Sequence, residues 1–240
     1  MTQGSRKVVM TGASGHIGRV IVPLLPQDWV MRRTDLTAHE GISALDVSDL
    51  GACREAFAGA DAVVHLAAVS DPSASWDELL PSNVVGVYQV AQAVADCGVR
   101  RLVLASSLHA VSGTPDESQS RASDAPRPGN LYGATKAWAE AVGAWLAATG
   151  SASVVAVRIG NFAEARPNPA APDRERSTWL RSAWLSPRDA AQLICAAVEA
   201  DGFDFLVANG ISANRYRVAD LQVTMQQLGY RPLDDAWQTQ

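Results

Sequence analysis

Two side chains spaced four residues apart, Tyr132 and Lys136, give the clearest indication of chemistry in this chain. On a helix this spacing directs both side chains to the same side. A phenolate can remove a proton from a reacting hydroxyl, and a neighbouring ammonium group lowers the pKa of the phenol. Because Tyr-x-x-x-Lys also occurs by chance as an exposed helical pair, its interpretation depends on the elements around it.

Two serines stand where a partner for the phenol is expected. Ser106 and Ser107 follow the apolar run 101–105, which predicts a buried strand, and ligands of α/β proteins bind at the carboxyl ends of such strands. Ser107 could hydrogen-bond the hydroxyl from which Tyr132 takes a proton, so that hydride leaves the carbon for a nicotinamide ring. Lys136 would also contact the nicotinamide ribose. We therefore predict a catalytic group of three residues: Ser107, Tyr132 and Lys136.

A glycine-rich turn at residues 11–18 could hold the phosphates of such a cofactor. Gly12 permits a tight turn and Gly15 lets the backbone approach a pyrophosphate, while Gly18 allows close packing of helix on strand. The spacing is G-x-x-G-x-x-G, which is a weak signal alone because glycine turns also occur without a ligand. Together with the tyrosine and lysine, it predicts a nicotinamide-dependent dehydrogenase.

Asp35 indicates which nicotinamide cofactor binds. It follows the predicted strand 29–33, where an acid can accept hydrogen bonds from both hydroxyls of the adenosine ribose and repel a 2′-phosphate. NAD is therefore favoured over NADP. Two alternatives remain open, because Arg32 and Arg33 could hold a phosphate and Asp35 could be a solvated turn acid. The other residues expected to contact the cofactor are His16, Ile17, Asp46 (at the adenine amino group), Val47, Leu66, Ala67, Ala68 and Ile159.

The elements that position these residues alternate between strands and helices. Strands are expected at 7–10, 29–33, 42–45, 62–66, 101–105, 153–159 and 203–208, and helices at 79–96, 131–148, 187–200 and 218–228. Pro23 and Pro26 predict that the helix after the glycine turn is short or kinked. This alternation predicts an α/β fold, a Rossmann-type doubly wound parallel sheet with a small C-terminal substrate cap. His65, in one of these strands, is expected to be buried and hydrogen-bonded.

Composition sets the limits of this organisation. The chain has 240 residues and 48% hydrophobic content, enough for a single domain, with a cofactor-binding core at about 1–159 and a substrate-binding part at about 160–240. A cap of that size encloses a monosaccharide more readily than a sugar nucleotide. A homo-oligomer is one alternative that the sequence leaves open.

Charge and hydropathy exclude several kinds of partner. The net charge of −5 and the dispersed basic residues give no surface for nucleic acid. No apolar run reaches the roughly 18 residues of a membrane span, and the N-terminus lacks a signal-like segment. We therefore expect a cytoplasmic protein without a membrane partner. Cys53, Cys97 and Cys195 are widely separated, which indicates buried thiols rather than a disulfide framework or a metal site.

These motifs resemble those of the short-chain dehydrogenase/reductase superfamily, extended branch, and more closely those of the uronate dehydrogenases. The resemblance rests on the runs 11–18, 65–70, 105–109, 132–136 and 158–160, and above all on Arg174 with the Ser-Thr-Trp run at 177–179. It implies oxidation of C1 of cyclic D-glucuronate or D-galacturonate with NAD to the aldarolactone. It also implies that Asn83 supports the active-site helix beside the cofactor and that the sugar contacts Ser70, Ser107, His109, Asn161 and Arg174.

The chain departs from that pattern at two positions. Leu108 stands where these enzymes usually carry asparagine, and Asn161 where they carry serine, which removes one polar contact to the sugar and alters another. The arginines of residues 166–181 still favour an anionic substrate, because a guanidinium can bind a carboxylate through two parallel hydrogen bonds. We expect Arg174 to do so and Arg166, Arg176 and Arg181 to lie on the surface.

Two other classes of function share parts of this pattern. A sugar-nucleotide epimerase, dehydratase or reductase would use the same catalytic residues, but it should have a longer cap. A non-catalytic regulator that senses NAD would be expected to lose the tyrosine or the lysine, and both are present in this chain.

Overall fold

A parallel β-sheet forms the centre of the computed structural model, which describes residues 5–113, 119–168 and 173–238. Its seven strands run in the order β3-β2-β1-β4-β5-β6-β9, and every neighbouring pair is parallel. The strands are β1 (Lys7–Thr11), β2 (Val30–Asp35), β3 (Ser43–Ala44), β4 (Ala62–His65), β5 (Arg101–Ser107), β6 (Ser153–Ile159) and β9 (Phe205–Gly210). The predicted doubly wound α/β fold is confirmed. The order in which successive strands are added to the sheet reverses between β1 and β4, and such sheets bind ligands at that point.

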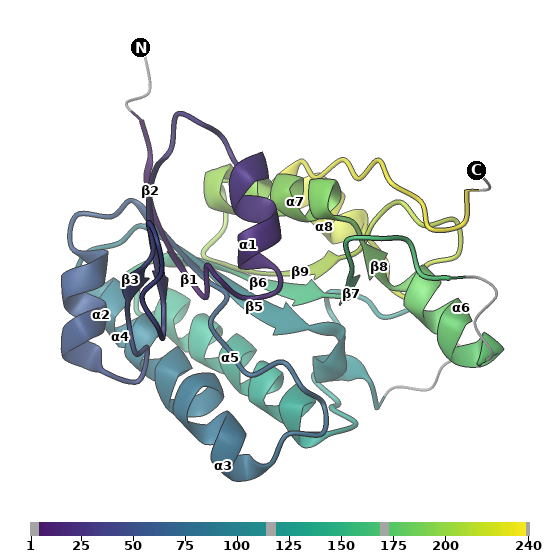
Figure 1. The fold of residues 1–240 in the computed structure, drawn as a ribbon, viewed down its shortest axis with the longest axis horizontal. Coiled ribbons are helices and arrows are strands. Elements are labelled where there is room, and N and C mark those ends of the chain that lie inside the picture. Colours follow the sequence, from purple (N-terminus) through teal and green to yellow (C-terminus); the bar gives the residue numbers. More distant parts are fainter. Residues whose placement is uncertain (1–4, 114–118, 169–172, 239–240) are drawn as a thin grey trace.

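Helices cover both faces of the sheet (Figure 1). One face carries α2 (Leu50–Phe57), α3 (Trp76–Leu79), α4 (Val87–Asp96) and α5 (Leu131–Ala148), and the other carries α1 (Gly18–Ile21), α7 (Pro187–Glu199) and α8 (Gln222–Leu228). Strand alternation explains the two layers. Val8 and Met10 pack in one apolar core and Val9 in the other, because successive strand side chains point to opposite faces.

The predicted helix 79–96 is three segments in the structure. A π-helical segment, η2 (Leu80–Gly86), joins α3 to α4. Pro81 lies in its first turn, and because proline has no backbone N–H it removes one of the bonds that a regular α-helix would make. Such irregular turns are frequent at functional sites, and this one carries Asn83.

The segment after β6 contains a helix that the sequence did not predict. No helix was expected between residues 160 and 186, but α6 (Arg174–Ser182) begins after Asp173, whose carboxylate accepts a hydrogen bond from the amide of Arg176 at 2.9 Å. Two short strands, β7 (Asn161–Phe162) and β8 (Trp184–Leu185), pair beside it. The part after residue 160 therefore contributes α6 as well as the last strand of the main sheet, β9. The helix α2 was also not foreseen.

Most other boundaries agree with the sequence. The helix after the glycine turn is short, as predicted: α1 is followed by one 3₁₀ turn, η1 (Val22–Leu24).

The three cysteines are free thiols, Cys53 buried and Cys97 and Cys195 half-buried. The described residues include no group of three metal-ligating side chains. No helix within the described ranges is long and apolar enough to span a membrane.

Candidate active site

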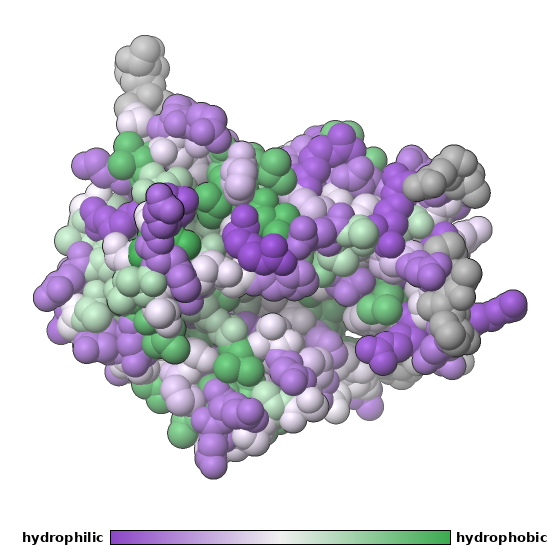
Figure 2. Space-filling view, in the orientation of Figure 1, coloured by the Kyte–Doolittle hydropathy of each residue, from purple (hydrophilic) through white to green (hydrophobic). Residues whose placement is uncertain are grey.

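A cavity of about 920 Å³ opens at the carboxyl edge of the sheet. The space-filling view shows the hollow at the centre of this face (Figure 2). All but two of the residues predicted to bind cofactor or sugar line it: Gly12, Gly15, His16, Ile17, Gly18, Asp35, Asp46, Val47, Leu66, Ala67, Ala68, Ser70, Ser107, His109, Tyr132, Lys136, Ile159 and Asn161. The two exceptions are Asn83 and Arg174, which lie elsewhere.

The glycine turn fits the phosphates of a dinucleotide. Gly12 has φ +70°, and a Cβ there would lie 2.5 Å from the amide nitrogen of Ala67, so a larger residue would push the turn away from β4. Among the described residues, the amides of His16 and Ile17 have no protein acceptor, and both residues line the cavity. Unpaired amides of this kind bind phosphate oxygens well.

Asp35 lies at the end of β2 and faces the cavity. Its Oδ2 accepts bonds from the amide (2.9 Å) and hydroxyl (2.6 Å) of Ser14, and its Oδ1 accepts one from the amide of Leu36 (2.8 Å). A carboxylate has about four lone-pair positions, so one ribose hydroxyl can bind directly. A second one would have to replace the hydroxyl of Ser14.

The two arginines that could have held a 2′-phosphate instead are turned to other parts of the protein. Arg32 donates to the carbonyl oxygens of Ala56 and Ala58 at the end of α2. The guanidinium of Arg33 lies beside Gly41, and neither arginine lines the cavity. This arrangement supports NAD over NADP.

Asp46 and Val47 line the part of the cavity that was expected to hold the adenine. Hydrogen bonds from the hydroxyl and amide of Ser48 lower the pKa of Asp46, so this acid is ionised and can accept a bond from an amino group. A Cβ on Gly86 would lie 2.7 Å from Cγ2 of Val47. Val47 is thus fixed against η2, which the cavity wall includes at Pro81 and Ser82.

Tyr132 and Lys136 are brought to the cavity by the first two turns of α5. Both are buried, with 7% and 5% exposure. The side-chain oxygen of Asn130 accepts a bond from the amide of Gly133 at 2.8 Å and so starts the helix at Leu131. A side chain on Gly133 would overlap the carbonyl of His109. This glycine therefore allows Tyr132 to approach the 3₁₀ turn η3 (Leu108–Val111).

Burial controls the protonation of this pair. It raises the pKa of Tyr132, while a hydrogen bond with Ser107 acts in the opposite direction. Burial also lowers the pKa of Lys136 to about 8. The sequence predicted that Lys136 lowers the pKa of the phenol, but its Nζ donates to the carbonyl of Ala105 at 2.9 Å and lies 5.5 Å from the centroid of the Tyr132 ring. The pKa of the phenol is therefore raised overall, and desolvation of the phenolate is the largest cause.

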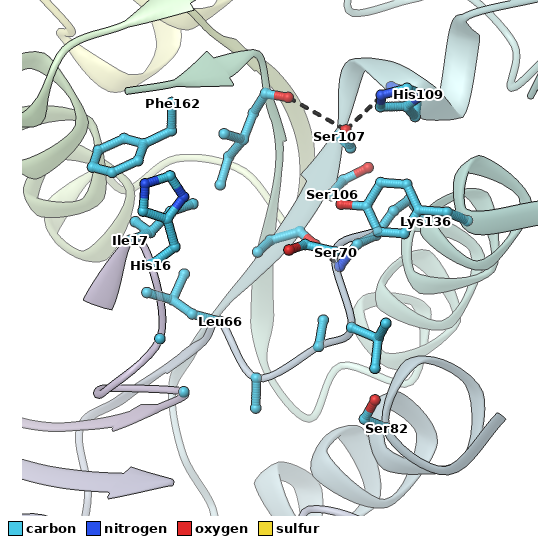
Figure 3. Close-up of a pocket in the computed structure, with 18 of the residues that line it drawn as sticks. His16, Ile17, Leu66, Ser70, Ser82, Ser106, Ser107, His109, Lys136 and Phe162 are labelled. Carbon is cyan, nitrogen blue, oxygen red and sulfur yellow. Dashed lines mark hydrogen bonds between the residues drawn. The ribbon is translucent and has the colours of Figure 1, made fainter. Parts of the chain in front are cut away.

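The two serines have different partners. Ser107 accepts a bond from the amide of His109 at 3.2 Å and lies 3.5 Å from the carbonyl of Ile159, inside the cavity (Figure 3). Ser106 donates to the buried carboxylate of Glu140 at 2.6 Å, which is also paired with Arg158 at 2.8 Å. The hydroxyl of Ser107 is thus the one available to a substrate.

His109 has a partner that the sequence did not reveal, Asn130. The amide nitrogen of Asn130 lies 2.9 Å from Nδ1 of His109, and the assignment of that nitrogen is fixed because the oxygen of the same amide caps α5. Nδ1 is therefore an acceptor, and the ring proton is on Nε2. Burial lowers the pKa of His109, so the ring is neutral and can donate from Nε2 into the cavity. An asparagine just before a predicted helix was the available signal.

His65 and Asn83 support the site from behind. His65 is 3% exposed, its Nδ1 lies 2.8 Å from Oγ1 of Thr11, and burial followed by the charge of Lys136 lowers its pKa to about 3. The expected buried, hydrogen-bonded histidine is confirmed. Asn83, 1% exposed, donates to the carbonyl of Val69 (2.8 Å) and to Oγ1 of Thr135 (3.2 Å). It joins the 66–70 loop to α5 and does not line the cavity.

The arginines of α6 lie in different surroundings. Arg176 is exposed, as expected, and with Trp179 and Leu180 it also lines the cavity that contains Ser107, Tyr132 and Lys136. Arg174 lines a second cavity, which shares Leu108, His109, Arg176 and Trp179 with the first. Within the described ranges neither Arg174 nor Arg176 has an ion-pair partner. Arg181 was expected on the surface but is half-buried against Trp237.

Comparison with known proteins agrees with this geometry. The chain is 38% identical over 96% of its length to L-arabinose 1-dehydrogenase (NAD(P)(+)) of Haloferax volcanii, covering 97% of that protein. It is 34% identical to the NAD-dependent glucose-6-phosphate dehydrogenase of the same organism, covering 95% of this chain and 94% of that protein.

A solved structure is also similar. The uronate dehydrogenase from Agrobacterium tumefaciens, as a mutant complexed with NAD, superposes with a TM-score of 0.85 at 28% identity, over 97% of this chain and 86% of that one. The model of the NAD dependent epimerase/dehydratase family matches residues 8–186. With NAD as its cofactor and a tyrosine, a lysine and a serine meeting in one cavity, this chain belongs to the NAD dependent epimerase/dehydratase family.

Proposed function

We propose that this chain oxidises C1 of a cyclic monosaccharide with NAD and releases the lactone. The observation that carries the proposal is the meeting of Ser107, Tyr132 and Lys136 beside His109 and Asn161 in a cavity whose far end fits a dinucleotide. The names of the relatives agree with this chemistry: an arabinose 1-dehydrogenase, a glucose-6-phosphate dehydrogenase and a uronate dehydrogenase.

Each residue of the site has its own role in this reaction. Bound NAD supplies the acceptor for the hydride that leaves C1. Ser107 and Nε2 of His109 donate hydrogen bonds to the sugar and hold the C1 hydroxyl towards Tyr132. The ionised Tyr132 takes the hydroxyl proton, and Lys136 stabilises that phenolate by its charge. Leu108 and Phe162 line the cavity and help to keep water from the reacting carbon.

An acidic sugar, such as a hexuronate, is the substrate class that α6 favours. Arg176 lines the catalytic cavity and Arg174 the adjoining one, and neither forms an ion pair with a described acid. A guanidinium without a protein partner can bind a carboxylate through two parallel hydrogen bonds. Arg176 is the better placed of the two, because it lies in the same cavity as Tyr132.

A neutral aldose is the second candidate, and Leu108 favours it. Leu108 is 5% exposed and lines the cavity beside Ser107, so an apolar wall replaces a polar contact there. The relative that shares 38% identity is named for a neutral pentose, whereas the uronate dehydrogenase of the solved structure shares 28%. A neutral pentose has no carboxylate, so an apolar wall beside it leaves no charged group without a hydrogen-bond partner.

A panel of sugars tests the proposal. Purified protein is mixed with NAD and each of D-glucuronate, D-galacturonate, L-arabinose, D-glucose 6-phosphate and UDP-glucose, and NADH formation is followed by its absorbance. We expect NADH from free monosaccharides, with kcat/KM greater for the uronates than for arabinose. Turnover of UDP-glucose with no turnover of a free sugar would contradict the proposal and favour a sugar-nucleotide enzyme.

A further inference from the structure

The last turn of α6 is fastened by a short segment from the end of the chain, residues 234–237, which we name the C-terminal strap. Nε and Nη2 of Arg181 donate to the carbonyl of Ala236 at 3.3 and 3.2 Å. The guanidinium carbon of Arg181 lies 3.8 Å from the centroid of the Trp237 ring, within the range of a cation–π contact. Trp237 in turn packs against Tyr216 in a T-shaped arrangement, with 4.9 Å between the ring centroids. Arg181 is thus bound on two sides by the strap.

The strap itself is anchored to the core of the protein. Asp189, fully buried on α7, accepts bonds from the amides of Leu233 (2.9 Å) and Asp234 (3.0 Å). The carboxylate of Asp234 accepts a bond from the hydroxyl of Ser186 at 2.6 Å, at the start of the same helix. Because hydrogen bonds to a buried carboxylate are strong and costly to break, the strap has a fixed position relative to the sheet.

A second set of bonds fixes the tip of the strap. Oδ1 of Asp235 accepts bonds from the amides of Arg215 (3.0 Å) and Trp237 (2.8 Å). The amide of Ala236 donates to the side chain of Asn214 at 3.0 Å. These bonds hold the backbone around Ala236 in place, and the carbonyl of Ala236 is the acceptor for Arg181 on α6.

The helix has other connections at both of its ends. Near its start, the hydroxyl of Ser177 donates to the carbonyl of Asn168 at 2.7 Å. At its last turn, Asn161 donates to the carbonyl of Leu180 at 3.3 Å, and the amide of Val218 reaches the carbonyl of Ser182 at 3.4 Å, both near the long limit for such bonds. Figure 1 shows α6 at the end of the molecule away from α2. Besides these long bonds, the last turn of α6 is held by the contacts of Arg181 with the strap.

We propose that the C-terminal strap, through Arg181 and Trp237, positions α6 as one wall of the sugar site and so sets the affinity for sugar. The same helix supplies Arg176, Trp179 and Leu180 to the cavity, whereas the NAD end is built from the turns after β1, β2 and β4. A change at the strap therefore alters sugar binding and leaves NAD binding intact. Arg181 and Trp237 act as positioning residues, because neither lines the catalytic cavity.

Two substitutions and their conservative counterparts test this inference. Arg181→Ala and Trp237→Ala remove the contact, whereas Trp237→Phe keeps an aromatic face and Arg181→Lys keeps the charge. We expect KM for the sugar to rise about tenfold in each alanine variant, with kcat changed much less and the Kd of NAD unchanged. Trp237→Phe should restore most of the sugar affinity. Arg100→Ala is the matched control, since Arg100 is an exposed arginine paired only with the exposed Asp201 among the described residues.

Hydrogen exchange gives a second readout that does not require a substrate. We expect the amides of residues 174–182 to exchange faster in Trp237→Ala than in the wild type, with the amides of α5 unchanged. This part holds whichever sugar is the substrate, while the KM part rests on the proposed function. If the wild type oxidised no sugar, the proposed function would fail, and exchange in α6 would still decide the role of the strap.

Specific outcomes would overturn the inference. An unchanged sugar KM in both alanine variants, or unchanged exchange in α6, would show that the strap does not position the helix. A parallel loss of NAD affinity would show a general effect on the fold. If an alanine variant did not fold, Arg181→Lys would decide, because it keeps the charge but loses the planar guanidinium that donates two hydrogen bonds to the carbonyl of Ala236; a wild-type sugar KM and wild-type exchange in α6 for this variant would overturn the inference.

Discussion

The substitution Asn130→Asp separates the two roles of Asn130. A carboxylate can still accept the bond from the amide of Gly133 and cap α5, but it cannot donate to Nδ1 of His109 as the amide does at 2.9 Å. The ring must then place a proton on Nδ1 to bond the carboxylate, so neutral His109 loses the proton on Nε2. Asn130→Ala removes both the cap and the donor.

The expected changes in stability and in kcat/KM follow from the hydrogen bonds that each Asn130 variant loses. Loss of the cap in Asn130→Ala costs about 1 kcal/mol of stability, which lowers Tm by roughly 2–4 °C for a chain of this size, whereas Asn130→Asp should keep Tm close to that of the wild type. Loss of a neutral hydrogen bond from Nε2 to the sugar costs about 1 kcal/mol, or about fivefold in kcat/KM. The loss is larger if the sugar oxygen remains buried without a donor.

The pH profile distinguishes this mechanism from a general loss. In Asn130→Asp the carboxylate raises the pKa of His109, opposing the effect of burial. The doubly protonated ring still donates from Nε2, so the defect should be small at low pH and should grow as pH rises through the pKa of His109. The assay is kcat/KM for the preferred sugar between pH 6 and 9, with Tm measured on the same samples. A wild-type profile in Asn130→Asp would refute the role assigned to His109.

Three further predictions follow from the site. Tyr132→Phe should lower kcat by about two to four orders of magnitude with little change in the Kd of NAD, and wild-type turnover of the variant would rule out Tyr132 as the base. In the wild type, kcat/KM should rise with pH, since burial raises the pKa of the phenol that must ionise. The wild type should bind NAD at least about tenfold more tightly than NADP, and Asp35→Asn should reduce this difference in Kd. Equal Kd values of the wild type for NAD and NADP in a titration would contradict the role of Asp35. Burial lowers the pKa of Lys136 from 10.5 to about 8, so the unfolded chain binds more protons than the folded one between those pH values. The free energy of unfolding of the free protein should therefore rise with pH in that range. This slope should flatten in Lys136→Met, and an identical slope in denaturant melts of the two proteins would contradict the lowered pKa.

Sequence reasoning located the sheet and most of the site because both depend on local patterns. Apolar runs of five to seven residues gave strands such as β6 with its observed limits, and the alternation of strand and helix led to the parallel sheet. The glycine turn and Asp35 follow strands whose carboxyl ends must meet at one edge. Their convergence on one cavity required no knowledge of distant contacts.

The remaining features depend on contacts that a sequence pattern does not carry. The π-helical segment η2 shares the apolar pattern of a regular helix, and the broken hydrogen bonding around Pro81 is visible only in three dimensions. The pKa of Tyr132 depends on burial, and the bond of Lys136 to the carbonyl of Ala105 could not be read from their spacing. The position of Arg181 depends on Trp237, more than fifty residues away along the chain.

The arginines show the same limit within a single helix. Four of them were close together in the sequence, and Arg174 was selected as the carboxylate ligand. The structure places Arg176 in the catalytic cavity and Arg174 in the adjoining one, because the side of a helix on which a residue lies depends on the residue at which the helix starts. That start, set by Asp173 as the N-cap, was not predicted.

The central claim is that C1 of a free sugar is oxidised with Tyr132 as the base, and carbon-13 NMR tests it most directly. A sugar labelled at C1 is incubated with NAD and the wild-type protein, and with the Tyr132→Phe variant as the control. The account predicts that the labelled anomeric signal is replaced by a lactone carbonyl signal, with one NADH formed per lactone, and that the variant produces neither at a comparable rate. An anomeric signal that persists while NADH accumulates would place the oxidation at another carbon and contradict the account.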